Sequence, residues 1–176
     1  MTAQPFAWSL AAVATLAAVP FLRAPSPAPA AGDEAALKAV DEAFVQAFNK
    51  KDVEGVLACY ADDAVLMDPG PALVFKGKEE IKRGIGEFFK AQPSAELKLD
   101  EVHYTAVGDV GYGWILWTIS MKGPDGSAMQ MKGRATDVMA KRGGKWVLVT
   151  DHASVPLPAP PTAGGAVPAK APPPKK

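Results

Sequence analysis

An aspartate that closes a short apolar segment is the residue of this sequence best placed to do chemistry. Asp68 follows the apolar residues 65–67 and precedes Pro69 and Gly70. A carboxylate held among apolar side chains suits a general base, because desolvation tunes its pKa for proton transfer. The position also suits a structural role, since an aspartate before Pro-Gly can hydrogen-bond the backbone of the turn. Both interpretations of Asp68 stay open at the level of the sequence.

Two further polar residues lie on segments that we expect to be strands. With strict alternation, His152 shares a face with Trp146 and Leu148, and a histidine there can act as an acid or base near neutral pH. Arg134, if its side chain points inward, would bind an anionic ligand group and keep Asp68 ionised. The alternatives are a core or rim histidine, and an arginine that lies on the surface or forms a structural salt bridge. We take Asp68 and His152 as the candidate catalytic pair and Arg134 as a candidate ligand contact.

The sequence contains no motif for a metal, a nucleotide or a covalent nucleophile. His103 and His152 form no His-x-His or Cys/His cluster. Residues 111–113 read Gly-Tyr-Gly, but they precede a strand pattern and not a helix. Cys59 is the single cysteine, so no intrachain disulfide can form, and we expect it to be a small buried apolar residue. We therefore expect neither a metal nor a cofactor.

The elements that must position these residues follow from apolar spacing and turn residues. Leu37, Val40, Phe44 and Phe48 form one stripe, which predicts a helix over about residues 34–49. Shorter patterns predict a helix from Asp52 to about Tyr60, a strand over 64–67, an extended segment over 73–75 and a helix from residue 78. Turns containing Gly, Asp and Pro separate four longer predicted strands, over 96–107, 110–122, 128–141 and 146–155.

The order of these elements carries a family resemblance. Together with the run of residues 60–64, Tyr-Ala-Asp-Asp-Ala, and the closing segment 151–156, it resembles the SnoaL-like and ketosteroid-isomerase-like branch of the nuclear transport factor 2-like superfamily. The resemblance covers about residues 35–156. It implies an α+β fold in which a curved, cone-shaped antiparallel sheet wraps the first helix, with two further helices. We expect four aromatic residues to line an apolar cavity inside it: Phe44, Phe48, Phe88 and Trp117.

The resemblance says less about chemistry than about shape. In ketosteroid isomerases the matching aspartate is the general base, which implies that role for Asp68. The tyrosine of the family's oxyanion hole falls on Phe44 and its protonated aspartate falls on Arg134, so steroid isomerisation is not expected. The leading hypothesis is a domain that binds an apolar or anionic small molecule. The alternatives are a cofactor-free acid/base enzyme (isomerase, cyclase, dehydratase or hydrolase) using Asp68 on an apolar carbonyl compound, and a dimeric scaffold.

Composition divides the chain into three parts. Only four of its 17 prolines lie within residues 32–155, which we expect to be the folded domain. Residues 1–31 contain an apolar run and the small residues 28–30, which predict a signal peptide and Ala/Pro linker, and hence export to the periplasm or outside. An uncleaved membrane anchor is the alternative. Residues 156–176 are rich in Pro, Ala and Lys, which predicts a disordered tail.

Charge and apolar patterning indicate the class of partner. All 19 acidic residues lie within residues 32–155, whereas only 15 of the 19 basic residues do, so the domain is slightly acidic. Nucleic-acid binding is not expected, because it requires a basic face. Large apolar residues occupy both faces of the segment 114–121, and one face must be covered by something other than the core. We therefore expect a homodimer formed through the sheet.

Overall fold

A computed structural model describes residues 31–157 of the chain as three helices and six strands. The elements are α1 (Ala31–Lys50), α2 (Val53–Leu57), β1 (Tyr60–Met67), β2 (Phe75–Lys76), α3 (Gly77–Ala91), β3 (Glu96–Val107), β4 (Val110–Lys122), β5 (Ala128–Arg142) and β6 (Lys145–Ser154). The predicted leader and the predicted C-terminal tail lie almost wholly outside the described residues. No helix within residues 31–157 is both long enough and apolar enough to cross a membrane.

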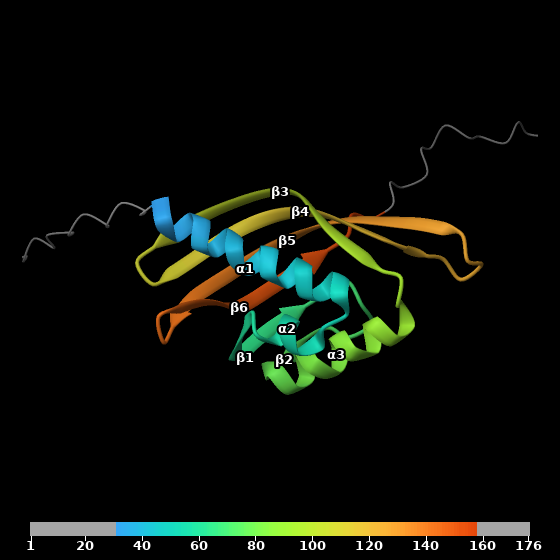
Figure 1. Cartoon of the computed structure of the whole chain (residues 1–176), viewed down its shortest axis with the longest axis horizontal. Helices are drawn as coiled ribbons and strands as arrows, with labels where there is room; N and C mark the ends of the chain where they lie inside the picture. Colours follow the sequence, from blue (N-terminus) through green and yellow to red (C-terminus); the bar gives the residue numbers. More distant parts are fainter. Residues whose placement is uncertain (1–30, 158–176) are drawn as a thin grey trace, which may run out of the picture.

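The six strands form one curved sheet in the order β2-β1-β6-β5-β4-β3. Strands β3 to β6 are joined as successive antiparallel pairs. Figure 1 shows α1 lying across one face of these long strands, with α2 and α3 beside β1 and β2. The predicted α+β fold is confirmed. The sheet is mixed and not wholly antiparallel, because β1 pairs with β6 in the parallel direction.

Local sequence explains how the first two helices are connected. Asp33 and Glu34 lie in the first turn of α1 and Lys50 lies in its last turn, so these charges complement the helix dipole. Asp52 caps α2, since its Oδ1 accepts a hydrogen bond from the backbone N–H of Gly55 at 2.9 Å. Helix α2 ends at Leu57, so the prediction of a helix reaching Tyr60 was too long.

The core lies between α1, α3 and the inner face of the sheet. Leu37 and Phe48 from the predicted apolar stripe of α1 are buried there, together with Ile81 and Phe89 of α3. Tyr60 is the first residue of β1 and is only 1% exposed. Because Tyr60 lies on a strand, its side chain points across the core toward β6, which matters for the site below.

A β-bulge decides which side chains of β6 reach the core. The register against β5 shifts between Leu148 and Thr150, which leaves Val149 as an extra residue. Leu148 lies before the bulge and is buried. An extra residue reverses the alternation, so after the bulge Asp151 faces inward and His152 is exposed.

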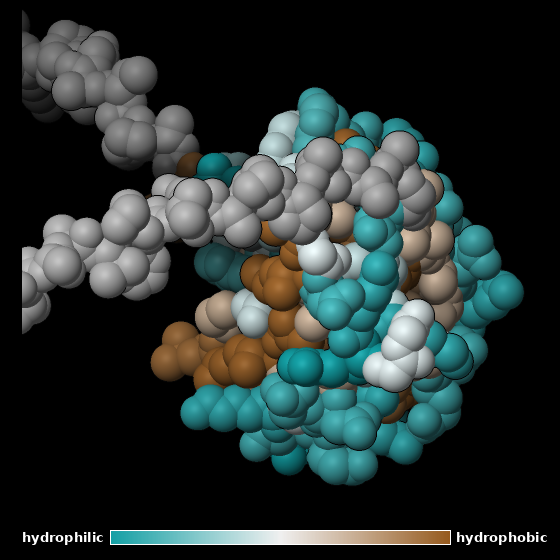
Figure 2. Space-filling model, turned by 90° about the vertical axis from the view of Figure 1, so that its left-hand side faces the viewer, coloured by the Kyte–Doolittle hydropathy of each residue, from teal (hydrophilic) through white to brown (hydrophobic). Residues whose placement is uncertain are grey.

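The outer face of β4 carries exposed aromatic and aliphatic side chains. Tyr112, Trp114 and Leu116 alternate along this strand and are 52%, 44% and 40% exposed. The ring of His103 stacks on that of Trp114, with centroids 4.1 Å apart. Figure 2 shows hydrophobic residues gathered on the left of the end that faces the viewer, bordered by hydrophilic ones. The structure thus has the apolar outer face that the sequence predicts, and dimerisation through it stays a prediction.

Candidate functional site

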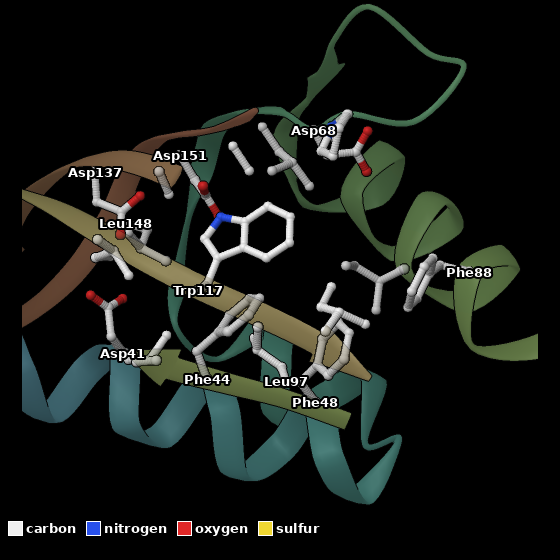
Figure 3. A pocket seen from close by; sticks show the side chains of 18 of the residues that line it. Asp41, Phe44, Phe48, Asp68, Phe88, Leu97, Trp117, Asp137, Leu148 and Asp151 are labelled. Atoms are coloured by element: carbon white, nitrogen blue, oxygen red, sulfur yellow. The ribbon is translucent and has the colours of Figure 1, made fainter. Parts of the chain in front are cut away.

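An apolar cavity of about 320 Å³ lies between α1, α3 and the inner face of the sheet. Most of its lining side chains are aromatic or aliphatic and come from seven elements, α1, α3, β1, β3, β4, β5 and β6. Its volume is within the range of cavities that hold small organic molecules. Figure 3 shows three aspartates, Asp41, Asp137 and Asp151, gathered at one end of the cavity, with Asp68 and Phe88 toward the other.

Aromatic rings form much of the cavity wall. Phe44 and Phe48 lie one turn apart on α1 with ring centroids 6.1 Å apart, and Phe88 of α3 lies 5.7 Å from Phe48. Trp117 projects from β4 and stands opposite Gly133 of β5. A Cβ atom at Gly133 would collide with the indole, so the glycine is what leaves room for the ring. All four aromatic residues expected at a cavity line it, whereas their part in binding stays a prediction.

Three aspartates from different parts of the chain meet in this cavity. Asp41 comes from α1, Asp137 from β5 and Asp151 from β6, and Asp137 and Asp151 are direct cross-strand partners. We call these three residues the aspartate cluster. Tyr60 donates a hydrogen bond to Asp151 Oδ2 at 2.6 Å, and Tyr104 donates one to Asp41 Oδ2. The two tyrosines therefore orient the outer members of the cluster.

Burial changes the acidity of the aspartate cluster. Removal from water raises the pKa of Asp41 to about 7, although the hydrogen bond from Tyr104 opposes this change. Burial, followed by the charges of Asp151 and Asp41, raises the pKa of Asp137 to about 10. Burial also raises the pKa of Asp151, against the effect of the Tyr60 hydrogen bond. At neutral pH, Asp137 therefore carries a proton while Asp41 lies near the midpoint of its titration.

Asp137 shares its proton with the other two members of the cluster. It is 3% exposed, its buried Oδ1 accepts no hydrogen bond from any other described residue, and its side chain hydrogen-bonds those of Asp151 and Asp41. Buried polar atoms are normally paired, because an unpaired one loses its interaction with water and gains nothing in return. The shared proton meets this requirement, so the polar groups left for a bound molecule are the carboxyl groups of Asp41 and Asp151, which line the cavity.

The family model for the SnoaL-like domain matches residues 42–149, which is more than half of the chain. The chain belongs to the SnoaL-like family. The resemblance proposed from the order of elements and the run at residues 60–64 is thereby confirmed. No curated protein sequence matches this SnoaL-like protein.

Solved structures similar to this SnoaL-like domain share its fold. A nuclear transport factor 2-like protein of unknown function from Pseudomonas putida KT2440 is 26% identical, with a TM-score of 0.64 over 74% of this chain and 92% of that one. A ketosteroid isomerase-like protein from Erwinia carotovora atroseptica is 23% identical, with a TM-score of 0.63 over 73% and 100%. A proposed dehydratase from Streptomyces avermitilis is 21% identical, with a TM-score of 0.64 over 70% and 97%.

Asp68 lies at the rim of the cavity of the SnoaL-like domain. It is partly buried, and its Oδ1 accepts a hydrogen bond from the backbone N–H of Gly70 at 2.9 Å. This contact is the turn interaction considered for an aspartate before Pro-Gly. Asp68 also lies near enough to Asp151 for its charge to contribute to the raised pKa of that residue. Asp68 thus has a structural partner and lies at the end of the cavity away from Asp41.

Arg134 and His152 do not line the cavity, so the arrangement expected for Asp68, Arg134 and His152 is not the one found. Arg134 is exposed on the outer face of β5, where its Nε lies 3.4 Å from Ser154 Oγ. His152 is exposed on the outer face of β6 because the bulge at Val149 reverses the alternation assumed for this strand. No Lys, Arg or His is among the lining residues in the described part of the chain.

Sequence reasoning missed the aspartate cluster, although two of its members left a signal. Asp41 lies four residues after Leu37 and three before Phe44, so it interrupts the apolar stripe of α1. Asp137 shares a strand face with Ala135 and Met139. A charged residue inside an apolar pattern is expected to be buried and functional or paired. Asp151 left no such signal, because only the bulge turns it inward.

Proposed function

We propose that this SnoaL-like domain binds one small, mostly apolar molecule, with the molecule's body against the aromatic wall and its polar group at the aspartate cluster. The aspartate cluster at one end of an otherwise apolar cavity is the observation that carries this proposal. An apolar cavity with a few convergent polar groups is the usual form of a small-molecule site. An anionic ligand is disfavoured, because the cavity wall offers carboxyl groups and no cationic side chain.

Mass spectrometry of protein purified from its native host tests this binding function. Under native conditions the protein should carry a defined compound of low mass, which is released on denaturation. Ala135→Phe places a ring in the cavity, since Ala135 lines it. Thr136→Phe is the matched control, because the neighbouring residue is exposed on the outer face of β5. The compound should be lost from the first variant and kept by the second.

Overpacking at Ala135 can itself destabilise the domain, so thermal unfolding of both variants must accompany the experiment. Retention of the compound by a folded Ala135→Phe protein would contradict binding in this cavity. An empty wild-type protein from the native host would favour the scaffold hypothesis instead.

A second candidate function is cofactor-free acid/base catalysis on the bound molecule. Asp41, with a pKa of about 7, can accept a proton near neutral pH, while Asp137, with a pKa of about 10, can donate one. In this version the aspartate cluster takes the role that the sequence assigned to Asp68. Turnover of the co-purified compound that Asp41→Asn and Asp137→Asn abolish, and that Asp68→Asn preserves, would support it.

We also propose that the domain acts after export. The apolar run at residues 5–22 and the small residues 28–30 support a cleaved leader. N-terminal sequencing of protein from the native host should find a chain that begins near Ala31. An intact Met1 on protein recovered from the cytoplasm would contradict export.

A further inference from the structure

The polar end of the cavity is rich in hydrogen-bond acceptors. Each member of the aspartate cluster has two carboxyl oxygens, whereas the donors that reach the cluster are the hydroxyl groups of Tyr60 and Tyr104 and the proton that Asp137 carries. Asp137 hydrogen-bonds Asp151 and Asp41, so these two residues, which line the cavity, hold the acceptors left for a ligand. The complementary ligand group is therefore one that brings several donors.

The charge of the residues that line the cavity also favours a ligand that carries hydrogen-bond donors. Among the described residues that line it, four are acidic and none is Lys, Arg or His. Burial is the main reason that members of the aspartate cluster take up protons, and repulsion among their charges adds to it. A cation placed beside the carboxyl groups would remove that repulsion and allow more of them to ionise.

The aromatic wall is suited to the same ligand. Phe44, Phe48 and Trp117 line the cavity and provide apolar surface and rings, and Phe44 and Trp117 lie nearer to the aspartate cluster than Phe48 does. Ring faces attract cations through their quadrupole, and the attraction is stronger where water is excluded. No group of three or more metal-ligating side chains within residues 31–157 is arranged to hold a metal ion, so an organic cation is the better match.

We propose that the natural ligand is an apolar amine whose ammonium group hydrogen-bonds the aspartate cluster while its hydrocarbon or aromatic body lies against the rings. This inference rests on the proposed binding function and specifies the chemical class of the ligand. The carboxyl groups of Asp41 and Asp151 receive the N–H groups, and Asp137 links these two acceptors. A neutral carbonyl ligand would need donors, whereas the tyrosine hydroxyls are committed to Asp41 and Asp151 and the proton of Asp137 is shared with the same two residues.

Binding of an amine must then be coupled to the release of protons from the protein. The ammonium group favours ionised carboxyl groups, so it lowers their pKa and displaces protons that the empty cluster holds. Four other titratable groups act on the cluster. They are Tyr60, Asp68, Tyr104 and His152. The proton release is therefore expected to come from the cluster itself, chiefly from Asp41.

Three probes with the same body and different head groups test the inference. They are 2-naphthylmethylamine, 2-naphthalenemethanol and 2-naphthoate, titrated into the wild-type protein by calorimetry at pH 7 in two buffers of different ionisation enthalpy. The amine should bind at least tenfold more tightly than the alcohol, and naphthoate should bind most weakly. The buffer dependence should show that the protein releases protons on binding the amine, and the amine's affinity should rise between pH 6 and pH 8.

Variants test whether the aspartate cluster causes the preference for the amine over the alcohol. Asp41→Asn and Asp137→Asn should each reduce the preference for the amine over the alcohol at least tenfold. Asp63→Asn, at an exposed position of β1, is the matched control and should leave the preference unchanged. The ranking of the three probes on the wild-type protein decides the matter even if a cluster variant fails to fold.

The outcomes separate this inference from the proposed function. If the alcohol binds as tightly as the amine, or the amine binds without proton release, the ammonium inference is wrong while binding in the cavity is supported. If none of the three probes binds at millimolar concentration, the inference is overturned, and the co-purification experiment then judges the binding function on its own. A preference for the amine that survives in both Asp41→Asn and Asp137→Asn would also overturn it.

Discussion

Replacing Asp137 with asparagine should change how the stability of this protein depends on pH. The folded protein keeps a proton on Asp137 up to a pKa of about 10, whereas the unfolded chain loses it near the ordinary aspartate pKa of about 3.9. Between these two values the folded state binds one more proton than the unfolded state. The free energy of unfolding must therefore fall as pH rises through that window.

The size of the effect follows from the number of protons. One proton of difference lowers the free energy of unfolding by about 1.4 kcal/mol for each pH unit. From pH 5.5 to pH 8.5 Asp137 alone should account for about 4 kcal/mol, and Asp41 should add to the slope up to its pKa of about 7. Asp137 is only 3% exposed, so solvent does not screen this effect. Asparagine carries no titrating proton, so the variant loses the Asp137 contribution.

Urea unfolding at pH 5.5, 6.5, 7.5 and 8.5 measures the slope for the wild type and for Asp137→Asn. As the pH rises, the free energy of unfolding should fall less steeply for the variant than for the wild type, by about 1 kcal/mol or more per pH unit. Asp63→Asn should run parallel to the wild type, because Asp63 is exposed. Parallel curves for the wild type and Asp137→Asn would refute the protonated, buried Asp137 on which the site rests.

Three further outcomes are expected. Asp68→Asn should change stability by less than about 1 kcal/mol in thermal unfolding, because an asparagine side chain can still accept the hydrogen bond from the Gly70 N–H; a larger loss would show that the carboxylate itself is needed. Tyr60→Phe should destabilise the domain by about 1–3 kcal/mol, since it removes the donor to partly buried Asp151, and urea unfolding at pH 7 would show it. Trp114→Lys on the outer face should convert the proposed homodimer to monomer in sedimentation velocity; a wild-type protein that is monomeric at micromolar concentration would contradict the dimer.

Local patterns in the sequence determined the elements and most of the cavity wall. The apolar spacing of α1 placed Phe44 and Phe48 on one face, and a helix keeps that relation whatever it packs against. The turn residues separated four hairpin strands with nearly the bounds that the structure shows. The Asp68 turn was also visible, because its hydrogen bond lies within three residues of chain.

Only the tertiary structure decided what lies at the polar end of the cavity. Asp41, Asp137 and Asp151 are far apart in the chain, and they meet because α1 lies across the sheet at the place where β5 and β6 pair. Strict alternation would turn His152 inward and Asp151 outward. A single extra residue, Val149, reverses this, because side chains of a strand alternate with a period of two and one inserted residue exchanges the faces of all that follow.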